Sequence, residues 1–235
     1  MNEVNEWQLS GRVPGSGQLD EHARVLVARM QAVIEITHDT VMVKVLPPAS
    51  VGRYLAGEVS AGEWGKRPPF DYRLVGGTVA RRQDTTNLRT PAELFQAFRL
   101  DYPASPFRRD LPAIPVMEFL AGDPDQYVTP LGAPTVREPQ LVLEEASPEV
   151  RAAAYAMVAA AESAGLDPNT YRKEIAPWPY TGTGITAADD LAVPERWRPH
   201  GLVPRGAVIM ERTATSEARM IAIYRNNLRG WKDVR

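Results

Sequence analysis

The chain has 235 residues, of which 44% are hydrophobic and 24% charged, proportions that are ordinary for a soluble globular protein. Its formal net charge of −2 offers no overall field to nucleic acid, and the lack of cysteine excludes disulfides and thiolate metal sites. No run approaches the roughly 18 apolar residues of a membrane span, so we expect neither nucleic acid nor a membrane as a partner.

Residues 1–17 are polar and contain several glycines, which predicts a flexible arm. The first six residues do not resemble a signal peptide, which favours a cytoplasmic protein, or one exported by a route that uses no such peptide. Asp20 can cap a helix that runs to about residue 37. The apolar face of this helix is formed by Val25, Leu26, Met30, Val33 and Ile34. That face needs a partner, either the main core or another subunit.

Two strands are expected in the first third of the chain. A β-branched run predicts one over residues 40–46, and Ser50 is placed to cap a short helix after it. The second strand is expected over residues 70–75 and is ended by Gly76-Gly77. Residues 78–81 then continue beyond a bulge or a hairpin.

The middle of the chain contains two strong helix starts. Thr90-Pro91-Ala92-Glu93 favours one, because the Thr90 and Glu93 side chains can each accept from the other residue's amide. Ser147-Pro148-Glu149 opens the second, which Gly165 ends. Between them, a strand is expected over residues 114–120, with its proline tolerated at a strand start or edge.

The last part of the chain is predicted to be irregular over residues 193–197 and 201–206, followed by antiparallel strands over 206–211 and 219–224. Strands and helices without a regular alternation predict an α+β fold. We expect small, mainly antiparallel sheets with flanking helices and proline-rich loops. Beyond the arm, we expect two parts: an amino-terminal lobe of helix and strand over residues 18–69, and a main domain over residues 70–235.

The segment over residues 178–186 is the first candidate site. Its hydroxyls and backbone amides, at Thr181, Gly182 and Thr183, can hold phosphate, while Trp178 and Tyr180 supply aromatic surface. The alternative is a glycine turn whose two aromatic rings fill the core. The segment has neither the Lys-Ser/Thr pair of a Walker motif nor the preceding apolar strand of a dinucleotide fingerprint.

Two charged residues complete the candidate site. Arg73, inside an apolar run, can present a bidentate fork to a pyrophosphate or carboxylate, or it can simply face solvent. Glu217 precedes the final strands and can orient a ribose hydroxyl or stabilise a developing cation, or it can be solvated. The three histidines, His22, His38 and His200, lack the spacing of metal ligands, so we expect no metal.

Several short motifs resemble the NAD-consuming domains found at the ends of bacterial polymorphic toxins, of the ADP-ribosyltransferase and NAD-glycohydrolase kind. They are Gly76-Gly77-Thr78-Val79-Ala80-Arg81, Leu88-Arg89-Thr90-Pro91, Pro179-Tyr180-Thr181-Gly182-Thr183-Gly184 and the closing strand into Gly230-Trp231. The resemblance implies a split α+β fold that binds NAD in a cleft. The family's Ser-Thr-Ser strand and Glu-x-Glu or Gln-x-Glu loop are missing. The missing motifs argue against transfer of ADP-ribose to a protein acceptor. The alternatives are simple cleavage of NAD or an inactive relative of the family.

On this resemblance Glu217 and Tyr180 are the predicted catalytic residues, and Arg73 holds phosphate. Trp178 and the Thr181-Gly182-Thr183 run complete the predicted NAD contacts. The sequence therefore predicts a toxin-like domain that cleaves NAD or transfers ADP-ribose. The alternative is a non-enzymatic binding or structural accessory protein of a secretion or phage-like system, with a protein partner on the amino-terminal helix.

Overall fold

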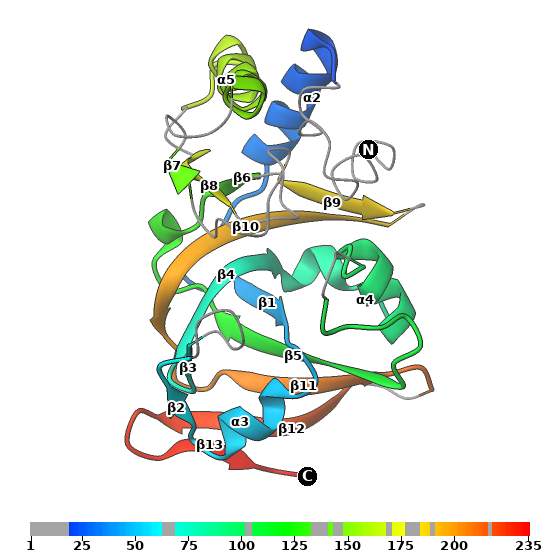
Figure 1. Ribbon diagram of the computed structural model, residues 1–235, viewed down its shortest axis with the longest axis vertical. Coiled ribbons are helices and arrows are strands. Elements are labelled where there is room, and N and C mark those ends of the chain that lie inside the picture. The colour runs from blue at the N-terminus through cyan, green and yellow to red at the C-terminus, as the bar shows by residue number, and fades with distance from the viewer. Residues whose placement is uncertain are drawn as a thin grey trace. The chain divides into compact units, whose positions relative to one another are not determined.

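The computed structural model (Figure 1) describes residues 19–62, 69–101, 105–132, 141–142, 148–167, 171–176, 184–188, 191–215 and 218–235. The predicted arm over residues 1–17 lies outside them. The chain forms two compact units. Unit 1 comprises Met1–Ile36, Gln96–Ser105 and Asp125–Trp197, and unit 2 comprises Thr37–Phe95, Pro106–Pro124 and Arg198–Arg235. The predicted division followed the chain at residue 69, whereas these units interleave along it.

The described residues contain helices together with mainly antiparallel strands, which confirms the α+β class. The hydrogen-bonded order of the largest sheet is β13-β12-β11-β5-β1-β4-β10-β9. Its strand β10 (Leu191–Leu202) passes from unit 1 into unit 2 after Trp197. In the described part of the chain, no helix is both long and apolar enough to cross a bilayer.

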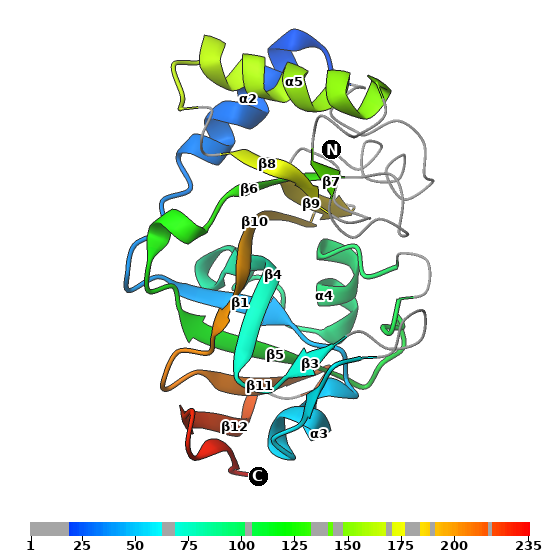
Figure 2. The ribbon, with the colours of Figure 1, turned by 60° about the vertical axis from the view of Figure 1, so that its left-hand side comes forward.

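Unit 1 contains the two long helices, α2 (Glu21–Ala32) and α5 (Pro148–Ser163), which pack against each other (Figures 1 and 2). Asp20 caps α2 as predicted, its Oδ1 accepting from the Ala23 amide at 2.7 Å. The helix ends at Ala32, earlier than expected. The predicted terminator Gly165 follows α5 with φ +76°.

Among the described residues of unit 1, five strands or strand segments accompany these helices. The strands β6 (Thr129–Gly132), β8 (Tyr171–Ala176) and β7 (Leu141–Val142) form a small sheet in that order. The strand β9 (Ile185–Ala188) pairs antiparallel with the start of β10, from Leu191↔Ala188 to Pro194↔Ile185. The end of the predicted 178–186 loop is therefore strand.

The assignment of residues 193–197 and 201–202 to irregular chain was wrong, because they belong to β10. Its charged residues made it resemble a loop, but in unit 1 they are satisfied by partners. Arg196 is buried and donates through Nη2 to the Gln31 carbonyl at the end of α2, at 2.9 Å, and through Nη1 to the Gln31 side chain. Gly184, with φ +63°, packs so closely on Gln31 and Thr129 that a Cβ would approach each to 2.6 Å.

Unit 2 is built on a sheet with the order β13 (Gly230–Asp233), β12 (Arg219–Asn226), β11 (Val208–Thr213), β5 (Ala113–Leu120), β1 (Val41–Val45) and β4 (Leu74–Arg81). The carboxyl end of β10 follows β4. The predicted final hairpin is confirmed as β11 and β12, which pair antiparallel. Pro115 lies in an interior strand, near its start, where the Pro115 carbonyl accepts from the Leu46 amide at 2.9 Å.

The region around Gly76-Gly77 differs from the sequence prediction. The pair β2 (Val59–Ser60) and β3 (Phe70–Asp71) is followed by a turn at residues 72–73, so Arg73 is not in a strand. The strand β4 then runs through both glycines and is not ended by them. It can do so because Gly77, with φ +80°, adopts a backbone conformation that other residues rarely tolerate.

Two further helices begin in unit 2, and the second continues past the division between the units at Phe95. In α3 (Ser50–Leu55), Ala49 is the N-cap, and the Ser50 hydroxyl donates to the Pro47 carbonyl at 2.7 Å instead of capping. Tyr54 of α3 packs edge-on against Trp231, with ring centroids 5.5 Å apart. The helix α4 (Pro91–Ala97) starts with the predicted capping box: Thr90 N donates to Glu93 Oε2 at 2.8 Å, and Glu93 N to Thr90 Oγ1 at 3.2 Å. The short 3₁₀ segments η2 (Arg82–Thr85) and η3 (Pro124–Gln126) complete the described elements.

Candidate functional site

A cleft of about 510 Å³ opens in unit 2, and we call it the Lys44–His200 cleft. Its polar side chains come from β1, β3 and the end of β10, as Lys44, Asp71 and His200. Tyr54 and Ser60 add hydroxyls, and the remaining wall is largely apolar, with Val59, Pro69, Phe70, Leu74 and Val75. A hollow of this size with few polar groups is typical of a small-molecule site.

The diglycine Gly76-Gly77 brings the Lys44 and His200 side chains to the same part of β4. A Cβ on Gly76 would lie 2.6 Å from the His200 Cα and 2.9 Å from its Cγ, so β10 can approach β4 only at a glycine. A Cβ on Gly77 would lie 3.5 Å from the Lys44 Nζ. The Lys44 ammonium donates to the Thr78 carbonyl at 3.4 Å, which fixes it beside the same strand.

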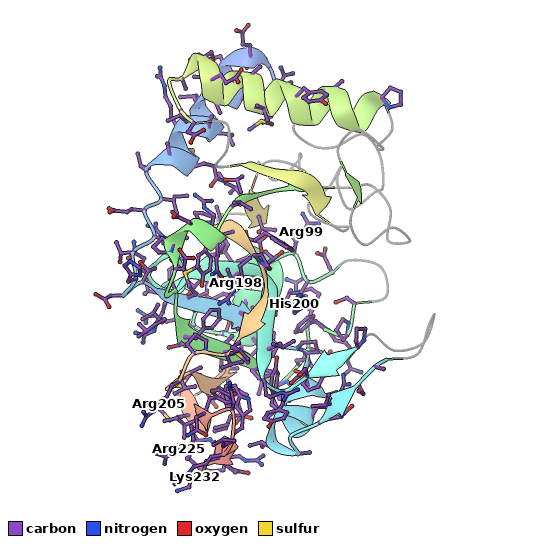
Figure 3. All side chains as sticks on the ribbon, turned by 90° about the vertical axis from the view of Figure 1, so that its left-hand side faces the viewer. Arg99, Arg198, His200, Arg205, Arg225 and Lys232 are labelled. Carbon is purple, nitrogen blue, oxygen red and sulfur yellow. The ribbon has the colours of Figure 1, made fainter. Side chains whose placement is uncertain are left out.

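His200 has an unusual electrostatic setting. Desolvation by burial lowers its pKa, and the positive charges of Lys44 and Arg198 lower it further. Figure 3 shows Arg198 and His200 close together on β10. At neutral pH the imidazole is therefore uncharged, and one ring nitrogen can accept a proton or a hydrogen bond while the other donates.

Asp71, at the end of β3, and Arg73, in the turn between β3 and β4, form an ion pair. The Arg73 guanidinium donates to Asp71 through Nε at 2.9 Å and through Nη2 at 2.7 Å. These hydrogen bonds lower the pKa of Asp71 below its usual value, so it lines the cleft as a carboxylate. Arg73 itself is 42% exposed at its side chain, and it borders the cleft through Asp71.

The other predicted site residues cannot be placed around this cleft. Trp178, Tyr180, Thr181–Thr183 and Glu217 lie outside the residues that the structure describes, so their roles stay predictions. Sequence reasoning missed Lys44, His200 and Asp71. Lys44 lies inside the apolar run over residues 40–46, which is the same signal that singled out Arg73. His200 was weighed only as a metal ligand.

The remaining charged residues of unit 2 include several structural ion pairs. Arg81 pairs with Asp84 at 2.7 Å, and Arg108 with Asp110 at 3.1 Å. Glu118, 10% exposed at its side chain, lies between Arg82 at 3.2 Å and Arg212 at 3.4 Å. Across the described ranges, no three histidine, aspartate or glutamate side chains converge in the manner of a metal site.

No family model matches the chain, and no curated protein or solved structure matches it significantly. The chain's own residues are the remaining source of information on a ligand. In unit 2 those residues are Lys44, Asp71 and His200, together with the diglycine that positions two of them.

Proposed function

We propose that unit 2 binds a small anionic ligand of the nucleotide class in the Lys44–His200 cleft, with NAD as the first ligand to test. The observation that carries this proposal is the convergence of Lys44 and His200 at Gly76-Gly77, in a cleft whose other walls are mostly apolar. A nucleotide has matching parts, because it combines phosphate oxygens with a flat, largely apolar ring.

Each polar residue has a defined part in such a complex. The Lys44 ammonium is a point charge suited to phosphate, and His200 can donate a hydrogen bond to a second phosphate oxygen. Asp71, ionised beside Arg73, accepts hydrogen bonds only, which suits a ribose hydroxyl. An anion next to His200 raises the pKa of the imidazole, so binding takes up a proton and strengthens as the pH is lowered towards 6.

The toxin resemblance extends this proposal to a reaction. Cleavage of NAD breaks the bond between the ribose C1′ and the nicotinamide nitrogen, nicotinamide leaves with the electron pair, and water or a protein nucleophile takes its place. Glu217 and Tyr180 remain the predicted catalytic residues for this step. Their contribution is separate from ligand binding by Lys44 and His200, and the two can be measured separately.

Isothermal titration calorimetry with inorganic phosphate, AMP, ADP-ribose and NAD tests the binding step. We expect NAD or ADP-ribose to bind, and Lys44→Met to weaken that binding at least tenfold. The matched control is Lys232→Met, an exposed lysine outside the cleft, which should leave affinity unchanged. No heat with any of the four ligands, or equal losses in the two variants, would contradict the proposal.

Nicotinamide release from NAD tests the reaction. Release that is lost in Glu217→Gln, while ADP-ribose still binds, supports the predicted catalytic residue. Binding without release would leave a nucleotide-binding module and reject the cleavage step alone.

The second candidate, a non-enzymatic binding module, is favoured by the outer face of α2. Leu26 and Met30 lie four residues apart on the helix, and Val33, its C-cap, follows three residues later; Met30 and Val33 are 54% and 79% exposed. Light scattering after size exclusion tests self-association through this stripe. A dimer that Met30→Glu dissociates would support it, and a monomer at about 100 μM that captures no host protein would count against it.

A further inference from the structure

Four cationic side chains gather at one end of unit 2. Arg205 lies in the turn before β11, Arg225 lies near the end of β12, Arg229 lies in the β12–β13 turn, and Lys232 lies on β13. The Gly206 amide donates to the Tyr224 carbonyl at 3.0 Å, which brings the first turn beside the end of β12. Figure 3 shows Arg205, Arg225 and Lys232 along the same edge.

These four residues, which we call the basic end, are exposed and form no ion pair with any described residue. Asp233, which follows Lys232 in the chain, is itself paired with Arg235, and Asp71 is paired with Arg73. The basic end therefore keeps a net positive charge, although the whole chain carries −2. None of its residues lines the Lys44–His200 cleft.

The turn that carries Arg229 also presents an exposed apolar side chain. Leu228 is 97% exposed at the tip of the β12–β13 turn, next to Arg229. The turn is held in shape below it, because Asn226 Oδ1 accepts from the Leu228 amide at 3.0 Å and from the Arg229 amide at 2.8 Å. Leu202, at the end of β10 and three residues before Arg205, is exposed as well.

We propose that the basic end docks on an anionic lipid surface, with Leu228 entering the headgroup region and the four cations meeting lipid phosphates and carboxylates. A lipid bilayer suits this arrangement because it offers negative charge and apolar depth together. Nucleic acid fits less well, since two aromatic rings of this end, Tyr224 and Trp231, are buried and cannot stack on bases. The third, Tyr72, is half-buried, its hydroxyl donates to the Asn227 carbonyl, and the Arg73 guanidinium lies 5.7 Å from its ring centroid.

Co-sedimentation of the full chain with sucrose-loaded vesicles tests the proposal. We expect binding to phosphatidylcholine vesicles containing 30% phosphatidylserine, no binding to phosphatidylcholine alone, and loss of binding in 0.5 M salt. Arg225→Glu should weaken binding about 25-fold, since it changes the charge by two units and about fivefold per charge is typical. The matched control is Arg109→Glu, which makes the same charge change at an exposed arginine before the start of β5.

The lack of native cysteine allows a second readout that does not depend on affinity. In a Leu228→Cys variant, an environment-sensitive fluorophore should shift to the blue on anionic vesicles, whereas the same label in Arg109→Cys should not. Equal losses for the Arg225 and Arg109 variants would overturn the proposal. It would also be overturned by an unshifted Leu228 label, or by duplex DNA binding that Arg225→Glu removes while vesicles do not bind.

Discussion

Gly76 provides the most direct test of the cleft, because the structure leaves no room for a side chain there. A Cβ at this position would lie 2.6 Å from the His200 Cα and 2.7 Å from its backbone nitrogen, whereas real Cβ atoms essentially never come closer than 3.0 Å. Both neighbours are backbone atoms, so in Gly76→Ala the end of β10 must retreat from β4 by roughly 0.4–0.8 Å. Overpacking of this kind costs about 1–3 kcal/mol of folding free energy.

Two measurements follow this displacement. Amide hydrogen exchange over residues 198–206 should be faster in Gly76→Ala, because the end of β10 opens more easily. The pKa of His200, followed by NMR, should rise towards its ordinary value as the imidazole leaves its desolvated position near Lys44.

The control makes the same substitution in α3. Nothing lies within 4 Å of a Cβ at Gly52, so Gly52→Ala should stabilise the protein by about 0.5–1 kcal/mol through helix propensity. If Gly76→Ala kept the wild-type exchange rate and the wild-type His200 pKa, the close packing of β10 on β4 would be refuted.

Three further predictions concern the two units separately. Gly184→Ala should lower the unfolding free energy by about 2–4 kcal/mol, measured by calorimetry, since the new Cβ would strain a left-handed backbone and strike Gln31 and Thr129. Arg196→Met should cost about 2–4 kcal/mol in urea unfolding by leaving the Gln31 carbonyl without its donor, and Arg196→Lys should restore less than half. Because the pKa of folded His200 is depressed, its unfolded form takes up a proton first. Stability should therefore be complete above about pH 6.5 and fall as the pH is lowered through that value, and His200→Gln should remove this component.

Local chemistry made several elements predictable. Asp20, the Thr90–Glu93 box and Gly165 act on amides and dihedral angles within a few residues of themselves, so a sequence pattern was sufficient to find them. The α+β class followed from the same patterns. The strand β1 was also predictable, since its β-branched run has no competing helical spacing.

The strand β10 was not predicted from the sequence pattern. Two prolines and the charged residues Glu195, Arg196 and Arg198 give it the composition of a loop. It is nevertheless a strand, because β9 pairs with its start and Gln31 satisfies the guanidinium of Arg196. Although β9 immediately precedes β10, Gln31 lies 165 residues from Arg196 in the sequence, a separation that no window of neighbouring residues spans.

The sequence by itself determined the fold class, the helix boundaries set by caps and the lack of any thiol chemistry, because these depend on composition and short-range contacts. Only the tertiary structure decided that Gly76 and Gly77 run through a strand and seat Lys44 and His200 in one cleft. Tertiary structure also brought three arginines and one lysine together at one end of unit 2, although the net charge of the whole chain is negative. Net charge is a sum over the whole chain, whereas a ligand meets only the charges that folding brings to one place.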